Sequence, residues 1–222
     1  MRVRADFREH AAVTPDRYEW VASPAPGVER MMLDRIGDEV ARATSLVRYA
    51  PNSRFPAHEH GGGEEILVLD GEFGDEHGRY PAGYYLRNPV GTRHSPRIGS
   101  AGATLFVKLH QFDAGDAAVL AVDTGKGGWI AGRIPGMEIQ PLHRHGAENV
   151  FLLRWAPDTA YPEHVHAGGE EILVLDGAFH DAAGHYPRGS WVRYPDGSRH
   201  APYTLDEGAL LYVKEGHLPA SM

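Results

Sequence analysis

The stretch HEHGGGEEILVLDG, His58–Gly71, returns 106 residues later as HVHAGGEEILVLDG, His164–Gly177. The comparison extends without a gap to Pro56–His94 and Pro162–His200, where 24 of the 39 aligned positions are identical. Such agreement indicates a duplicated segment. The chain is therefore constrained to fold as two copies of one unit.

The match continues on both sides of this segment. Upstream, Trp20–Glu29 corresponds to Trp129–Glu138 with a displacement of 109, and downstream the strings LFVK and LYVK correspond. The polar stretch 112–128 joins the copies. A chain of 222 residues suits two small domains, and we expect them at residues 1–117 and 118–222.

The segments within each copy are short, apolar and separated by turn residues. Examples are ATSLVRYAPNS, EEILVLDG, GYYLRNPVG and ATLFVKL, in a chain with 27 glycines and 16 prolines. No apolar stripe at helical spacing stands out. The pattern predicts an all-β chain of antiparallel sandwiches or small barrels. Because ILVL is apolar at every position, we expect both of its faces to be covered.

Composition excludes several classes of function. The absence of cysteine excludes disulfides, thiolate-bound zinc and iron–sulfur clusters. The net charge is 22 − 30 = −8 and no basic run stands out, so we expect no direct nucleic-acid binding. The start of the chain lacks the apolar core of a signal peptide, and no apolar run approaches the roughly 20 residues that cross a bilayer. We expect a cytoplasmic protein without membrane contact.

The repeated histidines are the candidate metal ligands. Side chains alternate along a strand, so His58 and His60 project to the same face. After three glycines come Glu64 and Glu65; strand parity favours Glu64, but a bulge in the glycine loop can reset the count. PVGTRH then brings His94 to the next strand through a turn.

The second copy repeats this set with the same internal spacing. Nitrogen and carboxylate donors suit a transition metal rather than calcium or magnesium, which prefer oxygen ligands. We expect up to one ion per domain, and these donors suit zinc, iron, manganese, nickel or copper. The candidate ligands are His58, His60, Glu64 and His94 in the first copy and His164, His166, Glu170 and His200 in the second.

These residues resemble the two cupin motifs, G-x5-H-x-H-x3-E-x6-G and P-x-G-x2-H. The resemblance implies Glu64 and Glu170 as the acidic ligands, with Gly71 and Gly177 closing the first motif. The first glycine of that motif is replaced by Asn52 and Asp158. Cupins are double-stranded β-helix (jelly-roll) barrels, so the resemblance implies two tandem cupin domains.

More narrowly, GGGEEILVLDG, YPAG, RNPVGTRHSP and LFVKL resemble the cupin-like domain of ChrR, a zinc-dependent anti-sigma factor of the oxidative-stress response. This implies zinc as the first candidate ion, and a metal-binding regulator or sensor whose partner is a sigma factor or another regulatory protein. ChrR binds its sigma factor through a separate helical domain with a His and Cys zinc motif, and the sequence here contains no cysteine for such a motif.

The same domain family includes acetylacetone-cleaving dioxygenases. The alternative function is therefore an iron-dependent dioxygenase that acts on a diketone or hydroxyaryl ketone bound in the barrel. Catalytic residues beyond the metal ligands are not indicated by either resemblance. Cupins often form dimers, so a homodimer is expected.

Overall fold

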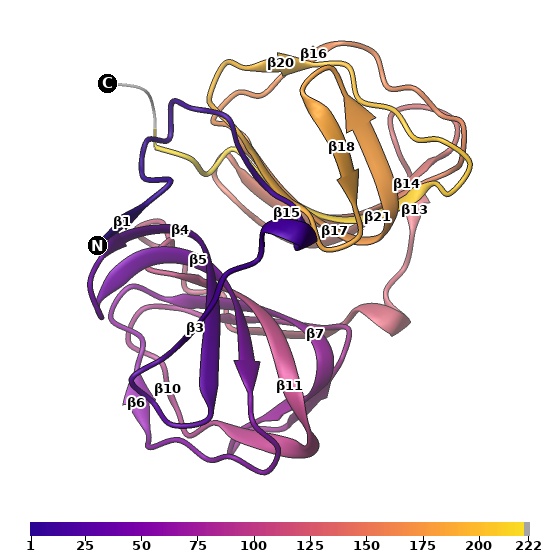
Figure 1. Ribbon diagram of the computed structural model, residues 1–222. Coiled ribbons are helices and arrows are strands. Elements are labelled where there is room, and N and C mark those ends of the chain that lie inside the picture. The colour runs from indigo at the N-terminus through magenta and orange to yellow at the C-terminus, as the bar shows by residue number, and fades with distance from the viewer. Residues whose placement is uncertain (220–222) are drawn as a thin grey trace. The chain divides into compact units, whose positions relative to one another are not determined.

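Residues 1–219 are described by a computed structural model and form two units built almost entirely of strands (Figure 1). Barrel 1 consists of Met1–Ala5 and Glu19–Gly127, and barrel 2 consists of Asp6–Tyr18 and the described residues from Gly128 onward. In this part of the chain the helical elements are two 3₁₀ turns, Pro15–Arg17 and Thr124–Lys126. No helix among them is long and apolar enough to cross a membrane. The all-β prediction is confirmed.

Barrel 1 contains a nine-stranded sheet in the order β1-β4-β5-β11-β7-β9-β12, with β3 on β4 and β8 on β7. A separate two-stranded sheet pairs β6 with β10. The strands are β1 (Arg2–Val3), β3 (Trp20–Ala22), β4 (Val28–Gly37), β5 (Ala41–Tyr49), β6 (His58–Glu59), β7 (Glu64–Gly74), β8 (Arg79–Pro81), β9 (Tyr84–Asn88), β10 (Arg93–His94), β11 (Arg97–Leu109) and β12 (Leu120–Asp123).

Barrel 2 repeats this plan with an eight-stranded sheet in the order β13-β14-β15-β21-β17-β19-β2, with β18 on β17. Its two-stranded sheet pairs β16 with β20. The strands are β2 (Ala11–Val13), β13 (Ile130–Ala131), β14 (Met137–His145), β15 (Glu148–Trp155), β16 (His164–Val165), β17 (Glu170–Asp181), β18 (Gly184–Pro187), β19 (Trp191–Tyr194), β20 (Arg199–His200) and β21 (Ala209–Glu215).

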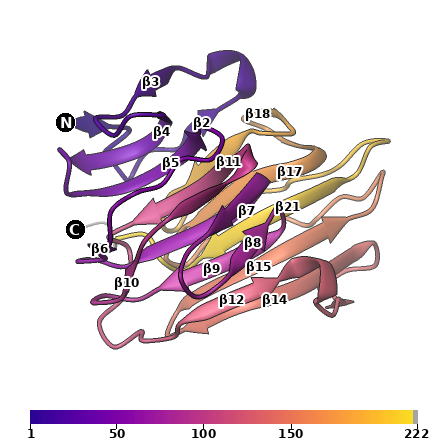
Figure 2. The same ribbon diagram turned by 90° about the horizontal axis from the view of Figure 1, so that it is seen from below.

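One edge strand of each repeat pairs in the barrel of the other repeat. β2 and β12 are counterparts at the displacement of 109. β12 nevertheless pairs with β9 in barrel 1 (Figure 2), and β2 pairs with β19 in barrel 2. Val13 lies opposite the fully buried Trp191. The compact units therefore differ from the sequence repeats 1–117 and 118–222. Barrel 1 contains β12 from the second repeat, and barrel 2 contains β2 from the first.

Strand alternation places the core of each barrel. In barrel 1, Ile66 and Val68 join a buried cluster with Phe73 and Leu105, while Leu67 is buried on the opposite face of β7. Both faces of ILVL are thus covered, as its unbroken apolar run indicates. The interior of barrel 1 is lined by alternate residues of β5 and is incompletely filled, which makes room for the cavity described below.

The glycine that ends the repeated stretch allows two strands to approach closely. Gly71 has a φ of +70°, and a Cβ there would overlap the carbonyl oxygen of Gly102 on β11. Gly115 has a similar φ of +88°, but open space surrounds it.

We therefore expect Gly71→Ala to destabilise the protein well beyond Gly115→Ala. Both variants lose about 1 kcal/mol through the left-handed backbone, and Gly71→Ala loses about 1–3 kcal/mol more through the steric conflict. The free energy of unfolding in urea measures the difference. Equal losses of unfolding free energy in the two variants would show that the close approach of Gly71 to Gly102 does not exclude a side chain at position 71.

Candidate metal centres

A short antiparallel sheet positions two of the candidate ligands in barrel 1. In the β6–β10 pair, His58 lies opposite His94. His60 follows β6, and its backbone is fixed on both sides: its amide donates to the carbonyl oxygen of Thr92 at 2.9 Å, and its carbonyl oxygen accepts from the amide of Gly91 at 3.0 Å. The Gly61–Gly63 loop then leads into β7, which begins at Glu64.

The four side chains converge on one point. The Nε2 atom of His94 lies 3.2 Å from that of His58 and 3.3 Å from that of His60. The Oε2 atom of Glu64 lies 3.2 Å from Nε2 of His60 and 3.6 Å from Nε2 of His94. His60 and His94 are buried, whereas His58 is exposed.

These separations fit a bound metal ion. Two ligand atoms at about 2.1 Å from a metal, at tetrahedral or octahedral angles, lie roughly 3.0–3.4 Å apart. Three imidazole nitrogens this close to one another also have few other ways to satisfy their lone pairs. The set His58, His60, Glu64 and His94 can therefore hold a transition metal.

Neighbouring polar groups orient these ligands. The Nδ1 atom of His60 lies 2.9 Å from the hydroxyl of Thr92, and Nδ1 of His94 lies 3.4 Å from a carboxylate oxygen of Asp75. The side-chain amide of Asn88 donates to Oε2 of Glu64 at 3.1 Å. Such contacts fix ring orientation and strengthen ligands.

The same contacts keep Glu64 ionised. Burial opposes ionisation of this carboxyl group, but the hydrogen bond and charge of His60, the charge of His94 and the Asn88 amide together hold its pKa below the usual value. A carboxylate that is already charged needs no proton release before it binds a cation.

The neighbouring glutamate has a different partner. Glu65 is buried and forms an ion pair with Arg87 at 2.9 Å, and Arg87 also pairs with Asp116. In barrel 2, Glu171 accepts a hydrogen bond from the indole of Trp191. Parity across the glycine loop is thus retained, and Glu64 is the glutamate that faces the histidines.

The counterpart residues in barrel 2 come together less closely. The ligand nitrogens of His164, His166 and His200 form a group, and His164 lies opposite His200 across β16–β20. Oε2 of Glu170, however, lies 3.6 Å from Nδ1 of His166 and 3.9 Å from Nε2 of His200. This oxygen and Nε2 of His166 are buried without a hydrogen-bond partner.

Two substitutions between the copies explain this difference. Asn88 is replaced by Tyr194, whose hydroxyl donates to Asp181 at 2.6 Å instead of to the glutamate. Without that support, burial raises the pKa of Glu170 to about 8, and the charge of Glu215 adds to the rise. Burial, together with the charges of His200 and His164, lowers the pKa of His166 to about 3.

The second substitution concerns the hydroxyl beside the middle histidine. Thr92 is replaced by Ser198, whose hydroxyl donates only to the carbonyl oxygen of Pro195. Asp181 keeps the role of Asp75, because it lies 3.1 Å from Nδ1 of His200. The sequence predicts eight ligands. In barrel 1 the structure brings four of them into one compact set, whereas in barrel 2 the three histidines form a group and the glutamate lies farther away.

The interiors of the barrels differ more than the ligands do. Barrel 1 encloses a cavity of about 410 Å³ that reaches His58 and Glu64, whereas the cavity beside the barrel 2 ligands measures about 80 Å³. Larger side chains fill barrel 2 at matched positions of β14 and β15, the counterparts of β4 and β5. Val28, Ser45, Val47 and Tyr49 of barrel 1 correspond to Met137, Phe151, Leu153 and Trp155.

Sequence reasoning missed the groups that support the ligands. Asp75 and Asp181 are identical in the aligned copies, and that identity was the available signal. Asn88, Thr92 and cavity residues such as Ser45 and Tyr49 carry no such signal, because they differ between the copies. Trp20 and Trp129 act as packing anchors, each stacked under an arginine: Arg48 lies 3.7 Å from the ring centre of Trp20.

Two barrels of this topology, each with histidines and a glutamate at one end of its interior, define a double cupin. Both repeats match the family of the ChrR cupin-like domain, over residues 8–113 and 117–219. The chain belongs to this family, and the predicted fold and family are confirmed. No curated protein matches the sequence significantly.

Solved structures share the fold at low sequence identity. A protein from Nostoc punctiforme described as a "putative dioxygenase" has a TM-score of 0.80 and 18% identity, covering 95% of this chain and 84% of that one. Protein Ylba from E. coli has a TM-score of 0.72 and 15% identity, covering 98% and 95%. Oxalate decarboxylase from Lactobacillus farciminis has a TM-score of 0.66 and 11% identity, covering 94% and 86%. These similarities establish the fold alone.

Loss of the Thr92 hydroxyl tests the importance of ligand support. We expect Thr92→Val to weaken metal binding by about 10–100-fold, because His60 loses the partner that orients its ring. Competition with a chromophoric chelator at substoichiometric metal measures this affinity. Ser198→Ala is the matched control, since it removes the equivalent turn hydroxyl without a histidine contact. If the two variants weakened metal binding equally, the loss would be due to the missing turn hydroxyl and not to the missing contact with His60.

Proposed function

We propose that barrel 1 is the active site of a metal-dependent oxygenase that binds a small enolisable ketone, such as a diketone or hydroxyaryl ketone, beside the metal. The observation that carries the proposal is the cavity of about 410 Å³ that reaches His58 and Glu64. A volume of this size is typical of small-molecule sites. A purely structural metal site needs no such space.

The donor set supports this chemistry. Four protein ligands leave two positions on an octahedral ion such as iron. When bound, the metal supplies Lewis-acid activation and a template for substrate and oxygen. Zinc, which the family resemblance implies, fits the same donors but has no redox chemistry, so the oxygenase proposal requires iron or another redox-active ion.

The chain's own residues contribute binding and shielding. Phe55, Val47, Val107 and Leu109 provide apolar cavity walls that exclude water, and Tyr49 adds a hydroxyl. Burial and the negative charge of Glu64 raise the pKa of this phenol, so it stays protonated and can donate a hydrogen bond to a ligand oxygen.

A regulatory role is the second candidate. The filled interior of barrel 2 favours it, because about 80 Å³ beside the histidines leaves little room for a substrate. A metal held there would act as a structural or sensing ion. Membership in the ChrR cupin-like family supports a partner such as a sigma factor or another regulatory protein.

Oxygen uptake distinguishes the two barrels. We expect iron-loaded protein to consume oxygen with at least one compound from a panel of diketones and hydroxyaryl ketones. His60→Ala should reduce the rate to background, because it removes a buried ligand beside the large cavity, whereas His166→Ala should retain it. Elemental analysis of both variants reports which ligand set has lost its metal.

The outcomes separate the two functions. Tight metal binding without oxygen uptake for any compound would contradict the oxygenase and favour the regulator. Activity that depends on His166 instead of His60 would contradict the assignment to barrel 1. A protein that binds no transition metal after purification and reloading would contradict both functions.

A further inference from the structure

A buried arginine in the wall of the barrel 1 cavity has no direct ion pair among the described residues, although the charges of Glu39 and Asp38 act on it. Arg35 is 4% exposed and lines the cavity, and its guanidinium donates to the backbone carbonyl oxygen of Asp38. No carboxylate of the described residues forms an ion pair with it. A buried charge without a partner is costly, so this group is suited to an anion that enters the cavity.

A β-bulge turns Arg35 into the interior. The pairing of β4 with β5 shifts register between Met32 and Asp34, so Arg35 lies opposite Ala43 on the same face as Arg30. Without the shift, strict alternation from Arg30 would place Arg35 on the outer face.

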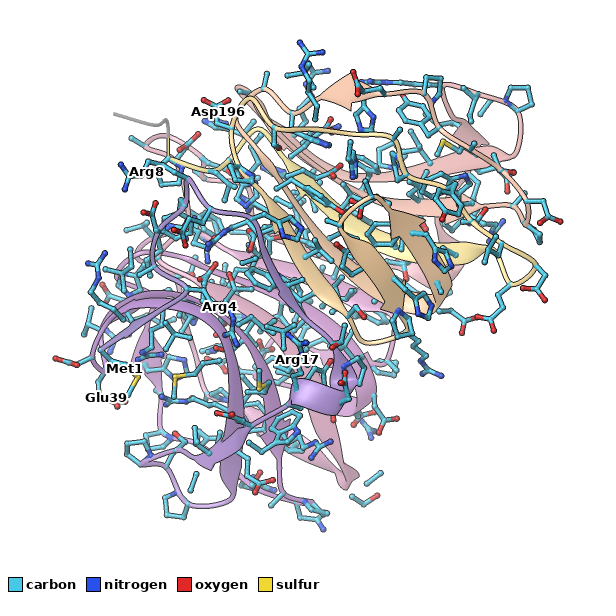
Figure 3. The ribbon with its side chains drawn as sticks, turned by 45° about the horizontal axis from the view of Figure 1, so that its top comes forward. Met1, Arg4, Arg8, Arg17, Glu39 and Asp196 are labelled. Atoms are coloured by element: carbon cyan, nitrogen blue, oxygen red, sulfur yellow. The ribbon has the colours of Figure 1, made fainter. Side chains whose placement is uncertain are left out.

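The bulge has dedicated hydrogen bonds. The guanidinium of Arg4 donates to the carbonyl oxygens of Met32 and Leu33, both at 3.0 Å, and the carboxylate of Asp34 accepts from the amide of Thr44. Arg4 lies among the strands of barrel 1 in Figure 3. The inward position of Arg35 is thus fixed by the surrounding structure.

A second cation lies close to Arg35. Burial lowers the pKa of Arg35 and the charge of Arg30 lowers it further, while the charges of Glu39 and Asp38 oppose this in part. Arg30 also lines the cavity, and its one ion pair is a long contact of 3.7 Å with Glu39. Glu39 also lines the cavity, but its side chain is 68% exposed, and Figure 3 shows it beside Met1. Such a surface contact contributes little, which leaves both guanidinium groups available.

The two arginines and the metal ligands line one cavity, and Arg35 lies at the level of Glu64. Arg35 lies opposite Ala43, Ala43 opposite Leu109, and Leu109 opposite Glu64 across successive strands. Three strand spacings, about 14 Å along the sheet, separate the backbones of Arg35 and Glu64. The direct distance across the barrel interior is shorter. Tyr49 also lines this cavity, and the charges of both Glu64 and Arg30 act on its phenol group.

Barrel 2 lacks this arrangement. Ile139 replaces Arg30, and Arg144, the counterpart of Arg35, is exposed and does not line the barrel 2 cavity. The paired cations are therefore specific to the barrel with the large cavity.

We propose that barrel 1 takes a small organic acid whose carboxylate binds Arg30 and Arg35 while its carbonyl oxygens face the metal ligands. The metal end of this inference rests on the proposed function, and the carboxylate end rests on the two arginines. A neutral ketone would leave Arg35 without a directly paired anion, so the cavity favours the acid over the neutral ketone.

Matched ligands test the carboxylate end. The zinc-loaded protein, which cannot turn over by redox chemistry, is titrated calorimetrically with 4,6-dioxoheptanoate and with its uncharged methyl ester. We expect the acid to bind about tenfold or more tightly than the ester, as charge-assisted hydrogen bonds contribute roughly 1.5–3 kcal/mol.

Arginine variants locate the effect. Arg30→Gln, at a partly exposed position, and Arg35→Met should each lower the affinity for the acid toward that for the ester and leave ester binding unchanged. Arg144→Met in barrel 2 is the matched control and should change neither. Circular dichroism establishes folding, and Arg30→Gln decides the question if Arg35→Met does not fold.

Equal affinities for acid and ester in the unaltered protein would overturn the inference, as would an acid preference that survives Arg30→Gln. These results are distinguishable from failure of the oxygenase proposal. An acid preference lost in Arg30→Gln, without oxygen uptake by the iron-loaded protein, would leave the organic-acid site standing. Oxygen uptake with equal binding of acid and ester would support the oxygenase and overturn the organic-acid site.

Discussion

The pairing of β6 with β10 is the constraint on which the metal centre of barrel 1 depends. Each strand has two residues, and their register sets His58 opposite His94. A slip of one residue would turn one ring to the other face. The backbone hydrogen bonds of His60 to Gly91 and Thr92 extend the same register to the third histidine, so one short sheet and its flanking loop position three nitrogens. Barrel 2 preserves this device, with His164 opposite His200.

The duplicated backbone supports two different interiors. The β4–β5 and β14–β15 pairs have corresponding registers, including a register shift at the same place. Differences in side-chain volume, such as Ser45 against Phe151, decide whether the barrel is hollow. The change from Asn88 to Tyr194 redirects a hydrogen bond from the glutamate to Asp181. A few interior substitutions thus separate a cavity beside a supported ligand set from a filled barrel.

The sequence predicted the double fold and the ligand positions because both depend on local spacing. Histidines two residues apart, and the recurrence of the whole pattern, are visible in one dimension. The cavity was not predictable, since its volume is the sum of side chains from strands far apart in the chain. The inward turn of Arg35 was hidden for a related reason: it depends on a bulge held by Arg4 and Asp34. The exchange of β2 and β12 escaped prediction because either copy can supply the same edge strand.

The features of barrel 1 are difficult to explain by stability alone. A cavity of about 410 Å³ forgoes packing contacts that barrel 2 makes with larger side chains at the same positions. A buried guanidinium without a carboxylate adds a desolvation cost, and the bulge that turns it inward is nevertheless secured by three hydrogen bonds. Because barrel 2 demonstrates that the same backbone can be filled, the hollow and charged interior of barrel 1 is not imposed by the fold. The interior of barrel 1 shows the pattern expected of a site that gives up local stability in order to bind a ligand.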